Sequence, residues 1–248
     1  MNFLREVKKY KHIEIKKLEA KQSENPFAKL FYPGRKSIVL ICEIKPKSPS
    51  GGILYSGNLI KLAKAYEKGG ADAISVLTDE RSFGGSINLL NEISKVVKVP
   101  ILRKDFIISK AQIIESVANN AHAILLIVKL LKPVILKKLI EFSNELKLLP
   151  IVEVTNDREI AIAVNAGAKV IGVNSRDLQT MKIDFDKALK TLSFIPKSCT
   201  ALLFSGISTR EDVQAAINYG GKGVLVGSGL IRSKNIKNKI KDLMYDKK

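Results

Sequence analysis

Four related stretches decide the fold of this chain: GGADAISV (69–76), NNAHAILL (119–126), AGAKVIGV (166–173) and YGGKGVLV (219–226). Each begins with small or turn-forming residues and continues into an apolar, strand-like segment. They recur roughly every fifty residues, which is about the length of two βα units. Quasi-repeats of this kind are typical of closed or stacked architectures.

Strand-like apolar runs recur at even spacing along the chain. They alternate with stretches of helical periodicity such as REDVQAAINYGG (210–221), which is typical of βαβ units and a parallel sheet. The eight strand-like runs are SIVLICEI (37–44), DAISVLT (72–78), VPILRK (99–104), HAILLIV (122–128), LPIVEV (149–154), KVIGVN (169–174), TALLFS (200–205) and KGVLVG (222–227). Eight βα units in about 250 residues predict an α/β fold, the (β/α)8 TIM barrel.

The turn after the first strand-like run argues against the main alternative, a doubly wound sheet. Such a sheet usually has fewer strands and a G-x-G-x-x-G turn after the first one. This chain has KPKSPSGG (45–52) at that place instead. We therefore favour the closed barrel.

Residues 1–35 precede the first strand-like run and are interpreted as an N-terminal helical extension. NFLREVKKYKHIEIKKLEA (2–20) predicts a helix with a basic face, and ENPFAKLFYPGR (24–35) ends it with two prolines and a glycine. The extension is too short to bury a core of its own. We expect it to pack on the barrel of residues 36–248, so that 1–248 form a single domain.

Composition restricts the function. The chain has 248 residues, 46% of them hydrophobic, so a sizeable core is expected. Its net charge of +18, from 42 basic and 24 acidic residues, favours an anionic ligand or a nucleic acid. Two cysteines imply no disulfide framework, and two histidines make a zinc site or a His-based triad unexpected.

The apolar segments of the sequence do not predict a membrane role. The charged N-terminus lacks the apolar core of a signal peptide, and the longest apolar run, AILLIV (123–128), is far too short to cross a bilayer. We expect a cytoplasmic protein with no membrane partner, present as a monomer or a weak dimer.

Charged and polar side chains gather at the C-terminal ends of the strand-like runs. Because strand side chains alternate between two faces, one face of each run carries them together with apolar residues. They are Glu43 and Lys45 on the first run, Lys104 on the third, Glu153 on the fifth and Asn174 on the sixth, with Arg176 just beyond. Barrel active sites lie at the C-terminal strand ends, so we expect these groups to converge on one pocket.

The last two strand-like runs end differently, in Ser205-Gly206 and in Gly227-Ser228. Loops after the seventh and eighth strands of a barrel often bind phosphate. Glycine lets backbone N–H groups approach a ligand closely, and serine adds a hydroxyl donor. The two turns therefore predict a phosphate site.

These motifs together resemble the indole-3-glycerol phosphate synthase family. They are E-x-K-x-x-SPS (43–50), ILRKDFI (101–107), IVEVTN (151–156), GVNSRDL (172–178), SGIS (205–208) and VGSGL (226–230), within a resemblance that runs from about residue 37 to 232. The resemblance implies a barrel lyase of tryptophan biosynthesis. Its substrate, 1-(2-carboxyphenylamino)-1-deoxyribulose 5-phosphate, is closed to indole-3-glycerol phosphate with loss of CO₂ and water. No cofactor and no metal are implied.

The resemblance also implies roles for individual residues. Lys104 is the acid that protonates the ketone oxygen, and Glu153 is the base of the dehydration step. Lys45 holds the departing carboxylate and is a second proton donor, oriented by Glu43. Asn174 and Arg176 position the substrate hydroxyls. The remaining binding residues are Lys47, Ser205, Gly206, Gly227 and Ser228 at the phosphate, Ser48 on the same loop as Lys47, and Phe83, Phe106 and Leu125 around the aromatic ring.

One position departs from the family pattern. The family usually has Glu just before the Ser-Gly of the seventh strand, where this chain has Phe204. By alternation Phe204 shares a face with Leu202, opposite Ser205. If that face is the pocket, a carboxylate is missing from it; otherwise the register differs.

Two other functions stay open at this point. A phosphoribosyl-sugar isomerase would keep the barrel and the phosphate site, but we find no pair of Asp acid-bases on the first and fifth runs. A nucleic-acid binder would explain the net charge, but no RRM, KH or helix-turn-helix pattern supports it, and no nucleic-acid partner is expected. The basic tail that motivates it contains Lys234, Lys237, Lys239, Lys241, Lys247 and Lys248.

Overall fold

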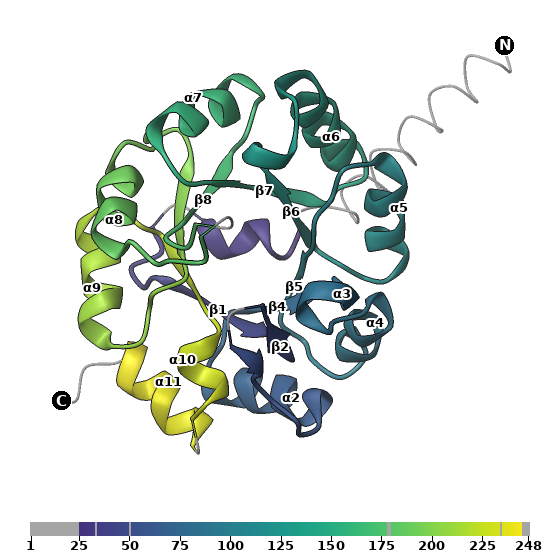
Figure 1. The fold of residues 1–248 in the computed structure, drawn as a ribbon, viewed down its shortest axis with the longest axis vertical. Coiled ribbons are helices and arrows are strands. Elements are labelled where there is room, and N and C mark those ends of the chain that lie inside the picture. The colour runs from purple at the N-terminus through teal and green to yellow at the C-terminus, as the bar shows by residue number, and fades with distance from the viewer. Residues whose placement is uncertain (1–24, 33, 50, 178–179, 234, 245–248) are drawn as a thin grey trace, which may run out of the picture.

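The chain folds into a closed barrel of parallel strands surrounded by helices (Figure 1). The computed structural model describes residues 25–32, 34–49, 51–177, 180–233 and 235–244. The barrel strands follow one another in the order β1-β10-β9-β8-β7-β6-β5-β4. Their bounds are β1 (Val39–Ile44), β4 (Ala73–Leu77), β5 (Ile101–Lys104), β6 (Ala123–Ile127), β7 (Leu149–Val154), β8 (Val170–Asn174), β9 (Thr200–Phe204) and β10 (Gly223–Val226). The predicted (β/α)8 barrel is confirmed.

Helices form the outer ring, and a small hairpin of β2 (Lys47–Ser48) and β3 (Gly52–Ile53) lies on the loop after β1. The α-helices are α2 (Leu59–Gly69), α3 (Glu80–Phe83), α4 (Ile87–Ser94), α5 (Lys110–Ala118), α6 (Pro133–Glu145), α7 (Asp157–Asn165), α8 (Phe185–Ser193), α9 (Arg210–Asn218), α10 (Ser228–Ile231) and α11 (Ile236–Met244). Two short 3-10 helices are η1 (Ala28–Phe31) and η2 (Val128–Leu130).

Side-chain caps begin several of these helices. Asn58, Ser86 and Asn156 stand before α2, α4 and α7. The side-chain oxygen of each accepts a hydrogen bond from a backbone N–H of the first turn, at 2.9, 3.0 and 3.0 Å. Those N–H groups have no partner within the helix, so such caps determine where each helix starts and how long the loop before it is.

The recurring sequence stretches contribute small residues to the inside of the barrel. Ala73 of β4 lies beside Ile41 of β1, and Ala123 of β6 lies beside Leu102 of β5. Gly223 of β10 is in register with Leu202, and a Cβ on this glycine would lie 2.8 Å from the Leu202 side chain. Small residues on alternate strands therefore make room for large residues on their neighbours, which lets eight strands close around a packed interior.

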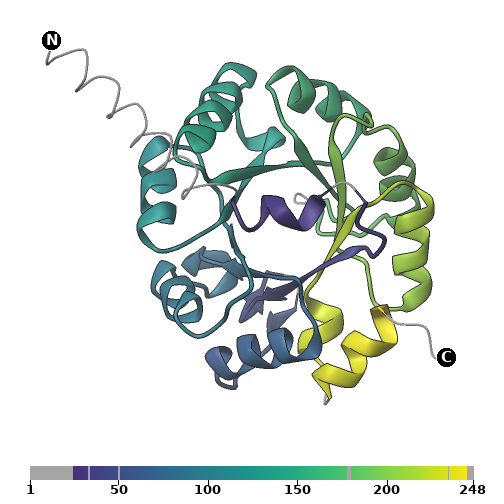
Figure 2. The ribbon, with the colours of Figure 1, turned by 180° about the vertical axis from the view of Figure 1, so that it is seen from behind.

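The N-terminal end of the barrel is covered by η1 (Figure 2). Phe27, just before η1, is 0% exposed and packs into the interior cluster with Val39 and Ala73. The Asn25 amide donates to the carbonyl oxygens of His122 and Lys147 at 2.6 and 2.8 Å, at the start of β6 and β7. The helix expected over 2–20 lies outside the described residues.

Phe204, the residue that departs from the family pattern, faces the barrel interior together with Leu202, and alternation predicts that these two residues share a face. The Phe204 side chain is 1% exposed and belongs to the interior cluster. A Cβ on Gly172 of the neighbouring strand β8 would lie 2.3 Å from two carbon atoms of the Phe204 ring. The ring therefore occupies space that exists only because residue 172 is glycine.

Gly172→Ala should lower the free energy of unfolding by about 1–3 kcal/mol, because the added methyl group overpacks against the Phe204 ring. In Phe204→Leu the ring is absent, so the same alanine should cost less in the double variant. Urea unfolding of the two single variants and the double variant measures this coupling. If the loss of unfolding free energy in the double variant equals the sum of the losses in the two single variants, the contact between residue 172 and Phe204 is contradicted.

Candidate active site

The strand-end residues meet at the C-terminal mouth of the barrel. A cavity of about 250 Å³ there is lined by Glu43 and Lys45 from β1 and the loop after it, and by Lys104 at the end of β5. Asn174 and Arg176, from β8 and its loop, line the same cavity, together with Ser205 and Ser228. Residues far apart in sequence thus share one pocket, as their positions at strand ends predict.

Two ammonium–carboxylate pairs stand at this mouth, and Glu153 of the second pair lines the adjoining cavity that it shares with Lys104. Lys45 Nζ lies 2.8 Å from Glu43 Oε1, and Lys104 Nζ lies 3.9 Å from Glu153 Oε2. The Asn174 amide donates to Glu153 Oε1 at 3.0 Å. Glu153 is 1% exposed, and its Oε2 has no hydrogen-bond partner among the described residues. One oxygen of Glu153 is therefore held by Asn174, while the other is buried, has no hydrogen-bond partner among the described residues and faces the Lys104 ammonium.

Glu43 is charged in spite of its burial. Desolvation alone would raise the pKa of this carboxyl, but the positive charges of Lys45, Lys104 and Arg176 outweigh it and hold the pKa below its usual value. Its carboxylate also lies against Gly227, where a Cβ would be 2.5 Å from Oε1. The carboxylate of Glu43 thus fixes the Lys45 ammonium next to the turn after β10.

The two serine–glycine turns line one cavity of about 240 Å³ at the mouth. Ser205 and Gly206 both have left-handed backbones, with φ of 67° and 77°. For a serine this conformation is uncommon and costs of order 1–3 kcal/mol, which points to a functional constraint on the turn after β9. Gly227 and Ser228, after the neighbouring strand β10, line the same cavity, and Lys45 and Arg176 also reach it. Backbone turns and cations facing one space suit a phosphate group.

An apolar slot adjoins the Lys104–Glu153 pair. Phe83, Phe106 and Leu125 line it together with those two charged residues. The centroids of the two phenylalanine rings are 6.2 Å apart. The three residues predicted to surround an aromatic ring are therefore brought together, directly beside the charged groups.

Arg176 and Ser48 both reach the pocket. The Arg176 backbone N–H donates to Asn174 Oδ1 at 3.0 Å, and its Nη1 donates to the Met181 carbonyl oxygen at 2.8 Å. The guanidinium is thereby fixed at the mouth. Ser48 lines the cavity that contains Glu43 and Lys104, and its Oγ accepts a hydrogen bond from the Gly51 N–H at 3.0 Å.

Lys47 is the predicted phosphate residue that the structure does not bring to the cradle. Its side-chain carbons lie by Gly84, where a Cβ would be 3.2–3.3 Å from three of them. Gly84 ends α3, on the side of the aromatic slot. In this conformation the first loop directs Lys47 away from Ser205 and Gly227, because residues 47 and 48 are paired in the β2–β3 hairpin.

Sequence reasoning missed other residues of the mouth. Asp79 lines the apolar slot. Arg232 lines the cavity that contains Glu43 and Lys104, and its guanidinium lies near Gly51. Both follow a strand end by two to six residues, so a search extended into the loops would have found them. Among the described residues, no group of three or more His, Cys, Asp or Glu could hold a metal ion. None of the helices in the described part of the chain is long and apolar enough to cross a membrane.

The fold and the site define a (β/α)8-barrel enzyme in which lysine–carboxylate pairs lie between an apolar slot and a phosphate-sized cradle. The family model of indole-3-glycerol phosphate synthase matches residues 3–243. The chain is 42% identical over 258 residues to the indole-3-glycerol phosphate synthase of Aquifex aeolicus, covering 98% of this chain and 99% of that protein. The chain therefore belongs to the indole-3-glycerol phosphate synthase family, which confirms the resemblance of its motifs.

Other relatives agree with this assignment. The indole-3-glycerol phosphate synthase of Alkaliphilus metalliredigens is 42% identical over 214 residues, covering 85% of this chain and 81% of that protein. Among solved structures, a thiamine phosphate pyrophosphorylase from Pyrococcus furiosus superposes with a TM-score of 0.62 over 83% of this chain and 93% of its own. At 14% identity that likeness concerns the fold alone.

Glu43→Gln should flatten the loss of stability in acid, although the variant is less stable at pH 7. The folded-state pKa of Glu43 lies below the unfolded value of about 4.3, so its carboxylate contributes stability that is complete above that pH and is lost as the pH falls through the folded value. Urea titrations between about pH 7 and pH 3 should show a shallower fall in the free energy of unfolding than in wild type.

Glu145→Gln is the matched control for this experiment. Glu145 is exposed at the end of α6, far from the pocket, and its variant should keep the wild-type slope. If Glu43→Gln also keeps that slope, the charges around Glu43 do not hold it ionised in the folded state.

Proposed function

We propose that the chain performs the reaction of its family through the residues at the barrel mouth. It is a carboxy-lyase of tryptophan biosynthesis that converts 1-(2-carboxyphenylamino)-1-deoxyribulose 5-phosphate to indole-3-glycerol phosphate, CO₂ and water. The observation that carries the residue assignment is the place of the Lys104–Glu153 pair, 3.9 Å apart, beside the apolar slot and in the same mouth as the phosphate cradle. A substrate with an aromatic ring at one end and a phosphate at the other spans these two subsites.

Ring closure is the first chemical step. The aromatic carbon that carries the carboxylate forms a bond to the ketone carbon, and the carbonyl electron pair moves to the oxygen. Lys104 donates the proton that this oxygen takes up. Its side chain is largely buried and borders Phe106 and Glu153, which suits proton transfer to a ligand held in the slot.

Decarboxylation follows at the same carbon. The bond to the carboxylate breaks, its electron pair restores the aromatic system, and CO₂ leaves. Lys45 holds the carboxylate until that point, because it is the other ammonium of the pocket and its position is fixed by Glu43 at 2.8 Å. Charge-assisted contacts of this kind also orient the ring carbon toward the ketone.

Dehydration completes the indole ring. The hydroxyl formed in the first step leaves as water after protonation by Lys45 or Lys104, and Glu153 removes the proton whose loss makes the new ring aromatic. Asn174 keeps one Glu153 oxygen occupied, and the other, Oε2, has no hydrogen bond among the described residues and lies 3.9 Å from the Lys104 ammonium. This division suits a base that must stay in one orientation through the reaction.

The partner in this proposal is a small anionic phosphorylated molecule, with no nucleic acid. The excess of lysine and arginine at the mouth, together with the net charge of +18, supports it. We propose that the enzyme acts in the cytoplasm, as a monomer or a weak dimer, because the family is one of amino-acid biosynthesis.

Lys104→Ala should lower the turnover number by about 10²–10⁴-fold, the usual contribution of a positioned acid. The assay follows indole fluorescence as purified protein meets the ribulose substrate. Binding of inorganic phosphate should stay at the wild-type value, because the cradle is built by other residues. Lys190→Ala, at an exposed position of α8, is the control and should turn over normally. Wild-type turnover by Lys104→Ala would remove the acid from this role.

A further inference from the structure

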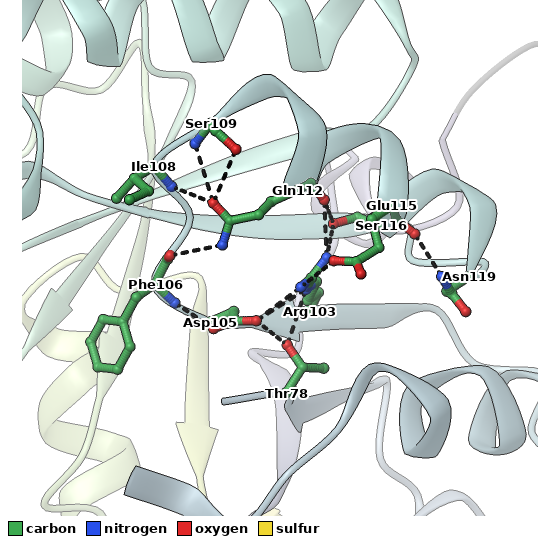
Figure 3. A network of polar contacts seen from close by, with 10 residues as sticks. All are labelled: Thr78, Arg103, Asp105, Phe106, Ile108, Ser109, Gln112, Glu115, Ser116 and Asn119. Carbon is green, nitrogen blue, oxygen red and sulfur yellow. Dashed lines mark hydrogen bonds and ion pairs between the residues drawn. The ribbon is translucent and has the colours of Figure 1, made fainter. Parts of the chain in front are cut away.

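Arg103 is a buried charge on the outer side of the barrel wall. It lies between Leu102 and Lys104 on β5, and alternation turns it away from the interior toward α5, where it is 4% exposed. Figure 3 shows its guanidinium at the centre of a group of polar side chains. Arg103 belongs to the motif ILRKDFI, but none of the binding or proton-transfer roles that the resemblance implies is assigned to it.

The guanidinium contacts three elements at once. Nε donates to Thr78 Oγ1 at the end of β4 at 3.0 Å, and Nη2 donates to Asp105 Oδ2 just after β5 at 3.0 Å. On α5, Nη1 donates to the Gln112 carbonyl oxygen and to Ser116 Oγ, both at 3.0 Å, and Nη2 lies 2.8 Å from Glu115 Oε2. The Thr78 hydroxyl in turn donates to Asp105 Oδ2.

Burying the Arg103 charge costs desolvation free energy that an apolar side chain in the same place would not cost. The space between a barrel strand and its helix is otherwise filled by aliphatic residues such as Ile101 and Ile113. Replacing a buried ion pair by apolar residues is often neutral or stabilising, so the buried charge of Arg103 is weak evidence for a role in stability. Its directional hydrogen bonds do what an aliphatic side chain cannot: they define the relative position of the elements they join.

The elements joined are those that carry the apolar slot. Asp105 Oδ1 accepts from the Phe106 N–H at 2.8 Å, and the Gln112 amide donates to the Phe106 carbonyl oxygen at 3.1 Å. Gln112 Oε1 also accepts from the N–H groups of Ile108 and Ser109, at 2.9 and 3.2 Å. The loop that presents Phe106 is thus held by side chains that Arg103 ties together (Figure 3).

The same contacts reach Lys104 and Phe83. The Thr78 backbone N–H donates to the Lys104 carbonyl oxygen at 3.1 Å. The next residue, Asp79, caps α3 by accepting from the Ser82 N–H at 2.6 Å, and α3 ends at Phe83. One outward-facing group of residues therefore borders both aromatic walls of the slot and the backbone of the proposed acid.

We propose that Arg103, with Thr78 and Asp105, is a positioning group for the aromatic end of the substrate. It sets the separation of the Phe83 and Phe106 rings and aligns the slot with the Lys104 ammonium. Arg103 and Thr78 do not line the slot, whereas Asp105 lines it. The inference rests on the proposed function for the identity of that ligand. A small displacement of such a wall is enough to reduce turnover strongly, because ring closure depends on the approach of two carbon atoms.

Thr78→Val and Thr78→Ser form a matched pair of variants that tests this. Valine keeps the shape but loses the hydroxyl that bridges Arg103 and Asp105, whereas serine keeps it. The probes are 2-aminobenzoate for the slot and inorganic phosphate for the cradle, each titrated by calorimetry. Thr78→Val should lower the affinity for 2-aminobenzoate about tenfold and change the affinity for phosphate by less than about twofold. Thr78→Ser should bind both probes with wild-type affinity.

Arg103→Lys extends the test, since lysine keeps the charge but cannot join all the partners. It should lower turnover and weaken 2-aminobenzoate, with phosphate unchanged. Arg35→Lys is its control, because the Arg35–Asp72 pair lies 2.7 Å apart near the N-terminal end of the barrel and should affect neither probe.

Three outcomes would overturn the inference. The first is that Thr78→Val and Arg103→Lys bind 2-aminobenzoate with wild-type affinity. The second is an equal loss of affinity for both probes, which indicates a general loss of structure. The third is that the wild-type protein does not bind 2-aminobenzoate. The proposed function fails separately, if the wild-type protein binds both probes but forms no indole product. Binding and turnover thus distinguish the two claims.

Discussion

The space inside a closed barrel of eight strands is the constraint on which the rest of the structure depends. Such an interior is just wide enough for side chains to fill, so large residues on every strand would not fit. This chain pairs Ile41 with Ala73 and Leu102 with Ala123, and it leaves Gly172 bare where the Phe204 ring lies. Closure with this filling brings all the C-terminal strand ends to one rim, and the catalytic chemistry depends on that convergence.

The charges at the rim are balanced by pairing. Lys45 holds Glu43 closely, whereas Lys104 and Glu153 stand farther apart and leave one carboxylate oxygen without a hydrogen bond among the described residues. In the proposed mechanism the tight pair is the fixed cation for the substrate carboxylate, and the loose pair supplies the proton donor and the base. The two chemically similar pairs differ in geometry, which suits the different steps proposed for them.

Most of what can be predicted from the sequence follows from the alternation of strand side chains between two faces. This alternation puts Glu43, Lys104 and Glu153 on the same face as apolar residues of their strands and puts Phe204 with Leu202, opposite Ser205, since residues two apart in a strand share a face. It could not predict Lys47, whose direction depends on a hairpin in the loop, where no period applies. Arg103 was overlooked for another reason: its partners come from a neighbouring strand end and a helix, and only three-dimensional contacts show that its face is occupied by polar groups.

The N-terminal end of the barrel is closed by η1 and Phe27, which affects where ligands can enter and leave. Phe27 is fully buried in the interior cluster at the N-terminal end, whereas the cavity lined by the proposed site residues lies at the C-terminal end. In the proposed reaction CO₂ is released next to Lys45, so it would leave by the same C-terminal mouth through which the substrate enters.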